Sequence, residues 1–153
     1  MASVAASFDD AGIADIKTFA TWLLSLQGRD DWAPFMNDKD FRDDHIQQLA
    51  HRERGCRMQM IHITLGFMID DLRDRAGFIF KVSGPCDTII RPYRGNTFPA
   101  YFITVTGRDT ATLDQITVKE ATLLRFEKET RVKIRDEGTI HIVALYLKIR
   151  PLI

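Results

Sequence analysis

The sequence contains little cysteine and no long uncharged apolar stretch. Its two cysteines, Cys56 and Cys86, permit one disulfide at most, far below the density of small secreted scaffolds, so a reducing, cytoplasmic compartment is expected. The opening residues MASVAASF lack the basic and apolar regions of a secretory signal. No segment approaches the roughly 18 apolar residues of a membrane-spanning helix. These absences favour a protein that works away from membranes.

Motifs of known chemistry are also missing. The sequence has no GxSxG, CxxC or HExxH motif and no glycine-rich phosphate loop. His45 and His51 are six residues apart, a spacing that does not place two side chains on one helical face. The segment 70–74 matches the DDxxD pattern of magnesium diphosphate sites, but Arg73 and Arg75 would neutralise its carboxylates. We therefore predict no catalytic residue, no metal ligand and no bound cofactor.

Two histidines have apolar surroundings. His62 and His141 lie in the runs IHITL and TIHIV. A buried histidine whose ring is hydrogen-bonded is the ordinary outcome of such a setting. The alternative is an active-site role beside Cys86, which lies in the turn-like stretch 83–87 and could act as a nucleophile. The sequence leaves that geometry open.

The charge is balanced overall but unevenly distributed. Residues 1–76 hold 9 Lys and Arg against 13 Asp and Glu, a net charge of −4, and residues 77–153 hold 12 against 8, a net charge of +4. With 45% hydrophobic and 27% charged residues, the composition is that of an ordinary globular protein. Opposed charge favours self-association if it persists at the surface, and neutralisation within the domain is the alternative.

The N-terminal half shows helical periodicity. Apolar residues recur at spacings of three and four between Asp9 and Gly28, which predicts a helix. A loop is expected at 29–37 and a second, shorter helix at 40–51. The stretch 57–75 also fits a helix, but its run MQMIHITL alternates with a period of two, so a strand at 57–69 is the alternative.

The C-terminal half is typical of antiparallel strands. In 129–135 apolar and basic residues alternate, so one face should be apolar and the other basic before the turn Asp136-Glu137-Gly138. The last strand is apolar on both faces and should lie centrally in the sheet. The expected strands are 78–83, 87–93, 98–106, 115–127, 129–135 and 139–149.

These elements predict a single α+β domain over residues 1–153. Helices in a part at about 9–75 should pack on a mainly antiparallel β-sheet in a strand-rich part at about 77–150. No repeat, low-complexity tract or Gly/Ser linker divides the chain.

Two segments are candidates for an interface. The basic residues of the late strands should share or border the outer face of one sheet; they are Arg125, Arg131, Lys133 and Arg135. Glutamates at 127 and 129 dilute their charge, so a solvated face or subunit contact is favoured over nucleic-acid binding. The apolar C-terminal residues Pro151, Leu152 and Ile153 are expected to dock on this domain or on a neighbouring subunit.

The sequence therefore favours a non-enzymatic structural or interaction subunit of a symmetric homo-oligomer or other assembly. A virion or phage-tail component, in place of a cytoplasmic complex, is one form of it. Weak nucleic-acid binding through the basic strands is an alternative.

A second alternative comes from a family resemblance. After the N-terminal helix, the segment Arg29-Asp30-Asp31-Trp32-Ala33-Pro34-Phe35 resembles the start of the nuclear-transport-factor-2-like dehydratases and isomerases. That resemblance implies a small-molecule-binding or lyase/isomerase-type enzyme, with helices closing a pocket over a strongly curved sheet. His62 or Asp31 would then be the base.

Overall fold

The computed structural model describes residues 3–26, 32–38, 41–49, 75–92 and 95–149. The elements in chain order are β1 (Ser3–Ser7), α1 (Asp10–Ser25), β2 (Trp32–Asp38), β3 (Phe41–Leu49), β4 (Arg75–Ser83), β5 (Cys86–Ile90), β6 (Asn96–Thr106), β7 (Arg108–Leu113), β8 (Ile116–Val118), β9 (Thr122–Phe126), β10 (Thr130–Ile134) and β11 (Thr139–Lys148).

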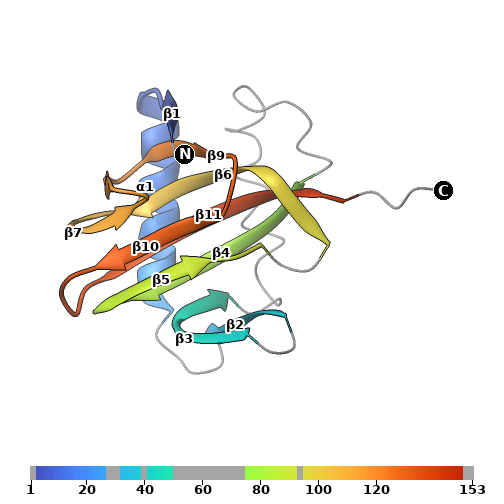
Figure 1. Cartoon of the computed structure of the whole chain (residues 1–153). Coiled ribbons are helices and arrows are strands. Elements are labelled where there is room, and N and C mark those ends of the chain that lie inside the picture. The colour runs from blue at the N-terminus through green and yellow to red at the C-terminus, as the bar shows by residue number, and fades with distance from the viewer. Residues whose placement is uncertain (1–2, 27–31, 39–40, 50–74, 93–94, 150–153) are drawn as a thin grey trace.

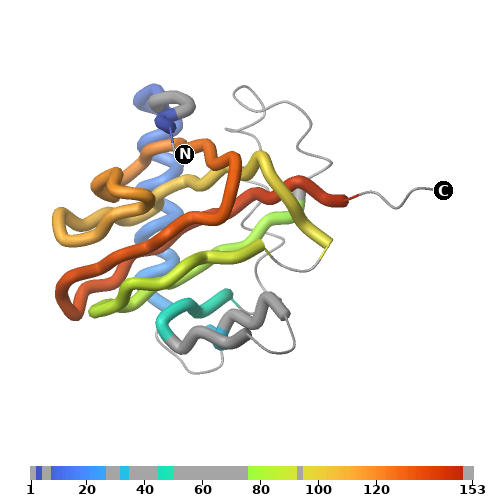
Figure 2. The backbone as a smooth tube through the Cα atoms, in the orientation of Figure 1, coloured from blue at the N-terminus to red at the C-terminus, as the bar shows by residue number. Residues whose placement is uncertain are grey.

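The strands form two antiparallel sheets that face each other (Figure 1). The large sheet has the order β1-β9-β6-β11-β4-β3-β2, and the small sheet has the order β5-β10-β7-β8. From β4 onward the chain pairs as one long hairpin, with β4 on β11, β5 on β10, β6 on β9 and β7 on β8. This hairpin is rolled so that successive pairs alternate between the sheets, as the backbone trace in Figure 2 shows. The result is a jelly roll, extended at both edges of the large sheet by N-terminal strands.

Two apolar layers hold the structure together. The first fills the space between the sheets, and the second lies between the large sheet and α1. β11 contributes to both, because Ile142, Ala144 and Tyr146 face the small sheet while Val143 and Leu145 face the helix. The prediction of a central last strand, apolar on both faces, is therefore confirmed: β11 lies between β6 and β4.

The predicted N-terminal helix is confirmed. The Asp9 carboxylate accepts a hydrogen bond from the backbone N–H of Gly12 at 2.8 Å and caps the first turn. Ile16, Phe19 and Leu23 lie on one helical face and are buried against the large sheet. Figure 1 shows α1 behind this sheet, on the side away from the small sheet.

The predicted α+β class is wrong, because the described residues contain only one helix and are dominated by two packed sheets. The segment 40–51, predicted as a helix, contains β3. Its apolar residues Ile46 and Leu49 are three apart, which suits a helix but also suits a strand that is covered on both faces. Ile46 faces the layer between the sheets, and Leu49 faces the layer beneath α1. The segment forms a strand instead of a helix because its backbone hydrogen-bonds to the otherwise open edge of β4.

The predicted loop at 29–37 contains β2. Pro34 suggested a turn, but a proline is tolerated in an edge strand, and β2 is the outermost described strand on its side of the large sheet. Trp32 is buried under α1, and its indole Nε1–H donates to the carbonyl of Leu26 at 3.0 Å. The family resemblance drawn from this segment implied one curved sheet closed by helices, which differs from the two-sheet fold.

The late strands were predicted more accurately than their pairing. The expected strand at 115–127 is two strands, β8 and β9, separated at Ala121 by a backbone φ of 55°. β7 was not predicted. The turn 136–138 does not close a hairpin, since β10 belongs to the small sheet and β11 to the large one. The ambiguous segment 57–69 lies outside the described residues.

Candidate functional site

The outer face of the small sheet carries the predicted basic residues of β10. Val132 and Ile134 point between the sheets and are buried, so Arg131 and Lys133 between them point outward and are exposed. Arg135 follows the strand and is exposed as well. The alternation predicted for this strand is confirmed, and it produces a basic outer face.

This face is hollowed around Arg131. The Arg131 guanidinium Nη1 lies 2.7 Å from the Asp87 carboxylate on β5, and its backbone N–H donates to the Asp114 carboxylate at 2.8 Å. Lys133 lies opposite Asp87 on one side and Thr112 on the other. Together these side chains line an open depression of about 480 Å³; its residues are Asp87, Thr112, Asp114, Gln115, Lys128, Arg131 and Lys133.

The remaining predicted interface residues lie elsewhere. Arg125 is on β9 in the large sheet, two residues from Leu123, whose side chain packs beneath α1, so Arg125 lies on the opposite side of the sandwich from Arg131. It pairs with Glu127. Pro151, Leu152 and Ile153 lie outside the described residues. The structure thus brings together Arg131, Lys133 and Arg135, but separates Arg125 from them.

The space between the sheets is filled by side chains. Among the described residues, its buried members are mostly aliphatic and aromatic, and the polar groups beside them include the Tyr146 hydroxyl and Thr130, which is in phase with Val132 on β10. Phe102 contacts Phe126 and Tyr146 with ring centroids 4.7 and 5.8 Å apart, and Phe98 contacts Tyr146 at 6.1 Å. Burial raises the pKa of Tyr146 well above its usual value. A jelly roll can hold a ligand in this space, but the described side chains occupy it with packed rings.

His141 is a buried core histidine, as its apolar surroundings predicted. It lies on the α1 side of β11 with 4% of its surface exposed. Its Nδ1 is 3.0 Å from the hydroxyl of Thr106, which also accepts from the His141 backbone N–H at 2.9 Å. Its ring lies against Trp32, with centroids 5.8 Å apart. Burial, and then the charge of Lys81, lowers the pKa of His141 to about 4.

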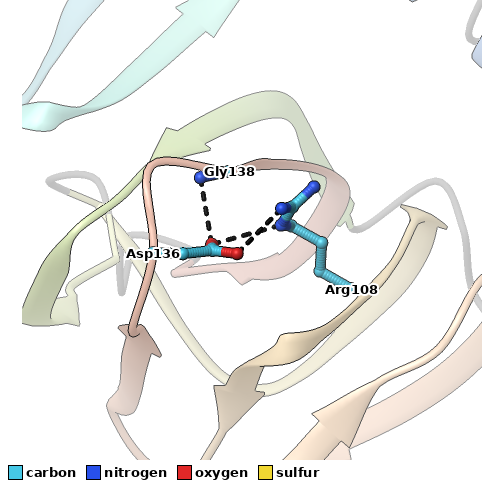
Figure 3. A network of polar contacts seen from close by, with 3 residues as sticks. All are labelled: Arg108, Asp136 and Gly138. Carbon is cyan, nitrogen blue, oxygen red and sulfur yellow. Dashed lines mark hydrogen bonds and ion pairs between the residues drawn. The ribbon is translucent and has the colours of Figure 1, made fainter.

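A polar network fixes the turn between β10 and β11 (Figure 3). The Asp136 carboxylate accepts two hydrogen bonds from the Arg108 guanidinium, at 3.2 and 2.8 Å, and a third from the backbone N–H of Gly138 at 3.0 Å. The bonds from Arg108 hold the pKa of Asp136 well below its usual range. A Cβ atom on Gly138 would overlap the Arg108 side chain, so a larger residue here would displace Arg108 from its present position against Asp136. The network stabilises the crossing between sheets and leaves Asp136 unsuited to act as a base.

No family model and no curated protein matches the sequence. Among solved structures, the chain is similar to a prolyl-4-hydroxylase from Pseudomonas putida, with a TM-score of 0.53 and 9% sequence identity over 98% of this chain and 93% of that chain. At this identity the similarity concerns the fold alone.

The described residues do not fit an oxygen-activating metal centre. One such centre is an iron ion held by two histidines and a carboxylate, as in the non-haem iron oxygenases. In residues 3–26, 32–38, 41–49, 75–92 and 95–149, no three His, Cys, Asp or Glu side chains are grouped to hold a metal ion. His45 is exposed, and His141 faces α1 instead of the space between the sheets. The similarity therefore transfers no reaction to this chain.

Cys86 lies at the start of β5 on the edge of the small sheet, whereas His141 belongs to the outer side of the large sheet. This placement gives no support to a nucleophile and base pair. Cys56, His62 and Asp31 lie outside the described residues.

The depression was not predicted, because three strands and two connections far apart in the sequence contribute to it. The one described helix is not long and apolar enough to cross a membrane.

Proposed function

We propose that this chain is a non-enzymatic structural or interaction subunit of a symmetric homo-oligomer. The observation that supports this proposal is the edge strand β1. It is the outermost described strand on its side of the large sheet, pairing only through one edge with β9. Its other edge offers backbone donors and acceptors to a further strand.

β1 lacks most of the features that protect an edge strand. Its sequence, SVAAS, contains no charge and no proline, the residue types that usually prevent pairing between sheets, although its pairing with β9 contains one irregularity. The other edges are better protected: β2 contains Pro34, β8 has only 3 residues, and β5 carries the exposed Asp87. Antiparallel pairing of β1 with its copy would join two large sheets across a two-fold axis.

The filled interior supports a non-enzymatic role. The described side chains between the sheets form a packed apolar layer, which is suited to rigidity and not to substrate binding. Jelly rolls serve this purpose in viral capsid domains. A virion or phage-tail component is one form of such an assembly, and a cytoplasmic complex is another, consistent with the two cysteines of the whole chain.

A matched pair of substitutions tests the proposal. Val4 on β1 and Leu24 on α1 are similarly exposed, at 58% and 55%, so replacing either with lysine should leave the fold intact. Light scattering after size exclusion, at tens of micromolar, should give an oligomer mass for the parent protein and Leu24→Lys, and a monomer mass for Val4→Lys. A charge on the edge strand opposes pairing, whereas the same charge on the helix does not. A monomeric parent protein, or an unchanged mass for Val4→Lys, would refute pairing through β1.

A further inference from the structure

The depression on the small sheet carries a second inference, independent of the assembly. We propose that it binds a small solute bearing phosphate or carboxylate groups, and that Lys128 and Lys133 hold the anionic group. The volume of about 480 Å³ is within the range of small-molecule sites. The lining combines these lysines with the polar groups of Thr112 and Gln115.

Lys133 is available for a ligand because the carboxylate opposite it on β5 is already engaged. It lies directly opposite Asp87 in the pairing of β10 with β5. Asp87, however, is bound by Arg131 at 2.7 Å. In the described part of the chain, Lys133 itself makes no ion pair. Its charge therefore faces the depression without a counter-ion among the described residues.

Lys128 is available for the same reason. It lies between Glu127 and Glu129 in the connection from β9 to β10. Glu127 pairs with Arg125, and Glu129 pairs with Arg91 at 3.4 Å. Both flanking acids are thus occupied by arginines that do not line the depression, and Lys128 makes no ion pair with any described residue.

The charges in the depression favour an anion over a cation. Two carboxylates and three cationic groups line it. Asp87 is neutralised by Arg131, whereas the Asp114 carboxylate accepts from the Arg131 backbone N–H at 2.8 Å and keeps its charge, so the lining as a whole is positive by one charge. Two ammonium groups remain for a ligand, each with three donors for phosphate or carboxylate oxygens. Thr112 and Gln115 can then bond the uncharged part of the solute.

Titration of the full-length protein, at constant ionic strength near 150 mM, tests the site. Calorimetry would use inorganic pyrophosphate in one arm and citrate in the other, which separates phosphate from carboxylate recognition. Each of Lys128→Gln and Lys133→Gln should weaken binding about 3-fold, and the double variant about 10-fold, as expected for exposed ion pairs.

Arg135→Gln is the matched control, because Arg135 is exposed at the end of the same strand but does not line the depression. Its affinity should stay within 2-fold of the parent value, as roughly expected for a charge outside the site. The proposal fails if neither anion binds, if the double variant binds as tightly as the parent, or if Arg135→Gln weakens binding as much as the lysine changes do. Light scattering of the double variant should show an unchanged mass, so that this test and that of β1 pairing can fail separately.

Discussion

Protonation of His141 should make the protein less stable in mild acid. The ring is buried against Trp32 and its pKa is lowered from 6.5 to about 4. In the unfolded chain the ring regains its ordinary pKa, so between these two values the unfolded state binds a proton that the folded state does not. The free energy of unfolding is therefore highest above pH 6.5, decreases as the pH falls, and levels off near pH 4.

The size of this effect follows from the shift. One pKa unit corresponds to about 1.4 kcal/mol, so the step between pH 7 and pH 4.5 should be about 2.5 kcal/mol. Urea unfolding at pH 7, 6, 5 and 4.5, followed by circular dichroism, would measure it. His141→Asn keeps a polar group near Thr106 but removes the titration, and its stability should change about 2.5 kcal/mol less over the same range.

Val143→Ala is the control for general destabilisation. Val143 is fully buried on the same face of β11, so shortening it should cost about 1–3 kcal/mol at every pH without altering the pH dependence. If His141→Asn loses as much stability in acid as the parent protein, the pH dependence has another source. In that case the assignment of His141 as a neutral core residue with a low pKa is wrong.

Two further changes test other parts of the structure. If the apolar C-terminal residues dock on a neighbouring subunit, removing residues 149–153 should lower the mass measured by light scattering. Circular dichroism should still report a folded domain. If the parent protein is monomeric and the deletion lowers only its melting temperature, these residues dock on their own domain. Tyr146→Phe should leave the free energy of unfolding within about 0.5 kcal/mol of the parent value or raise it, because the buried hydroxyl has no hydrogen-bond partner among the described residues. A loss of stability above about 1 kcal/mol in a urea titration would show that the hydroxyl has a partner.

Local sequence patterns predicted helices and strands best where the element has a single buried face. α1 has a cap at Asp9 and a single apolar stripe, and β10 alternates strictly between buried and exposed residues. Both were found where the sequence predicted them. In each case the residues that decide the conformation lie within a few positions of one another, so no distant contact was needed.

Prediction failed where distant contacts decide the structure. Ile46 and Leu49 have helical spacing, and only the layers on both faces of the large sheet explain why they lie on a strand. The turn 136–138 resembles a hairpin turn, but Arg108 on β7 fixes it as a crossing between sheets. The basic residues likewise appeared to form one group, and the assignment of β9 and β10 to different sheets separates Arg125 from Arg131.

The position of β11 constrains the order in which the chain can fold during synthesis. This strand follows β4 to β10 in the sequence, yet it lies between β4 and β6 at the centre of the large sheet. Until the ribosome releases it, β4 and β6 have no strand between them, and α1 lacks part of the surface that it covers. The nascent chain therefore exposes apolar strands until late, which makes folding slow and favours binding by chaperones before β11 emerges.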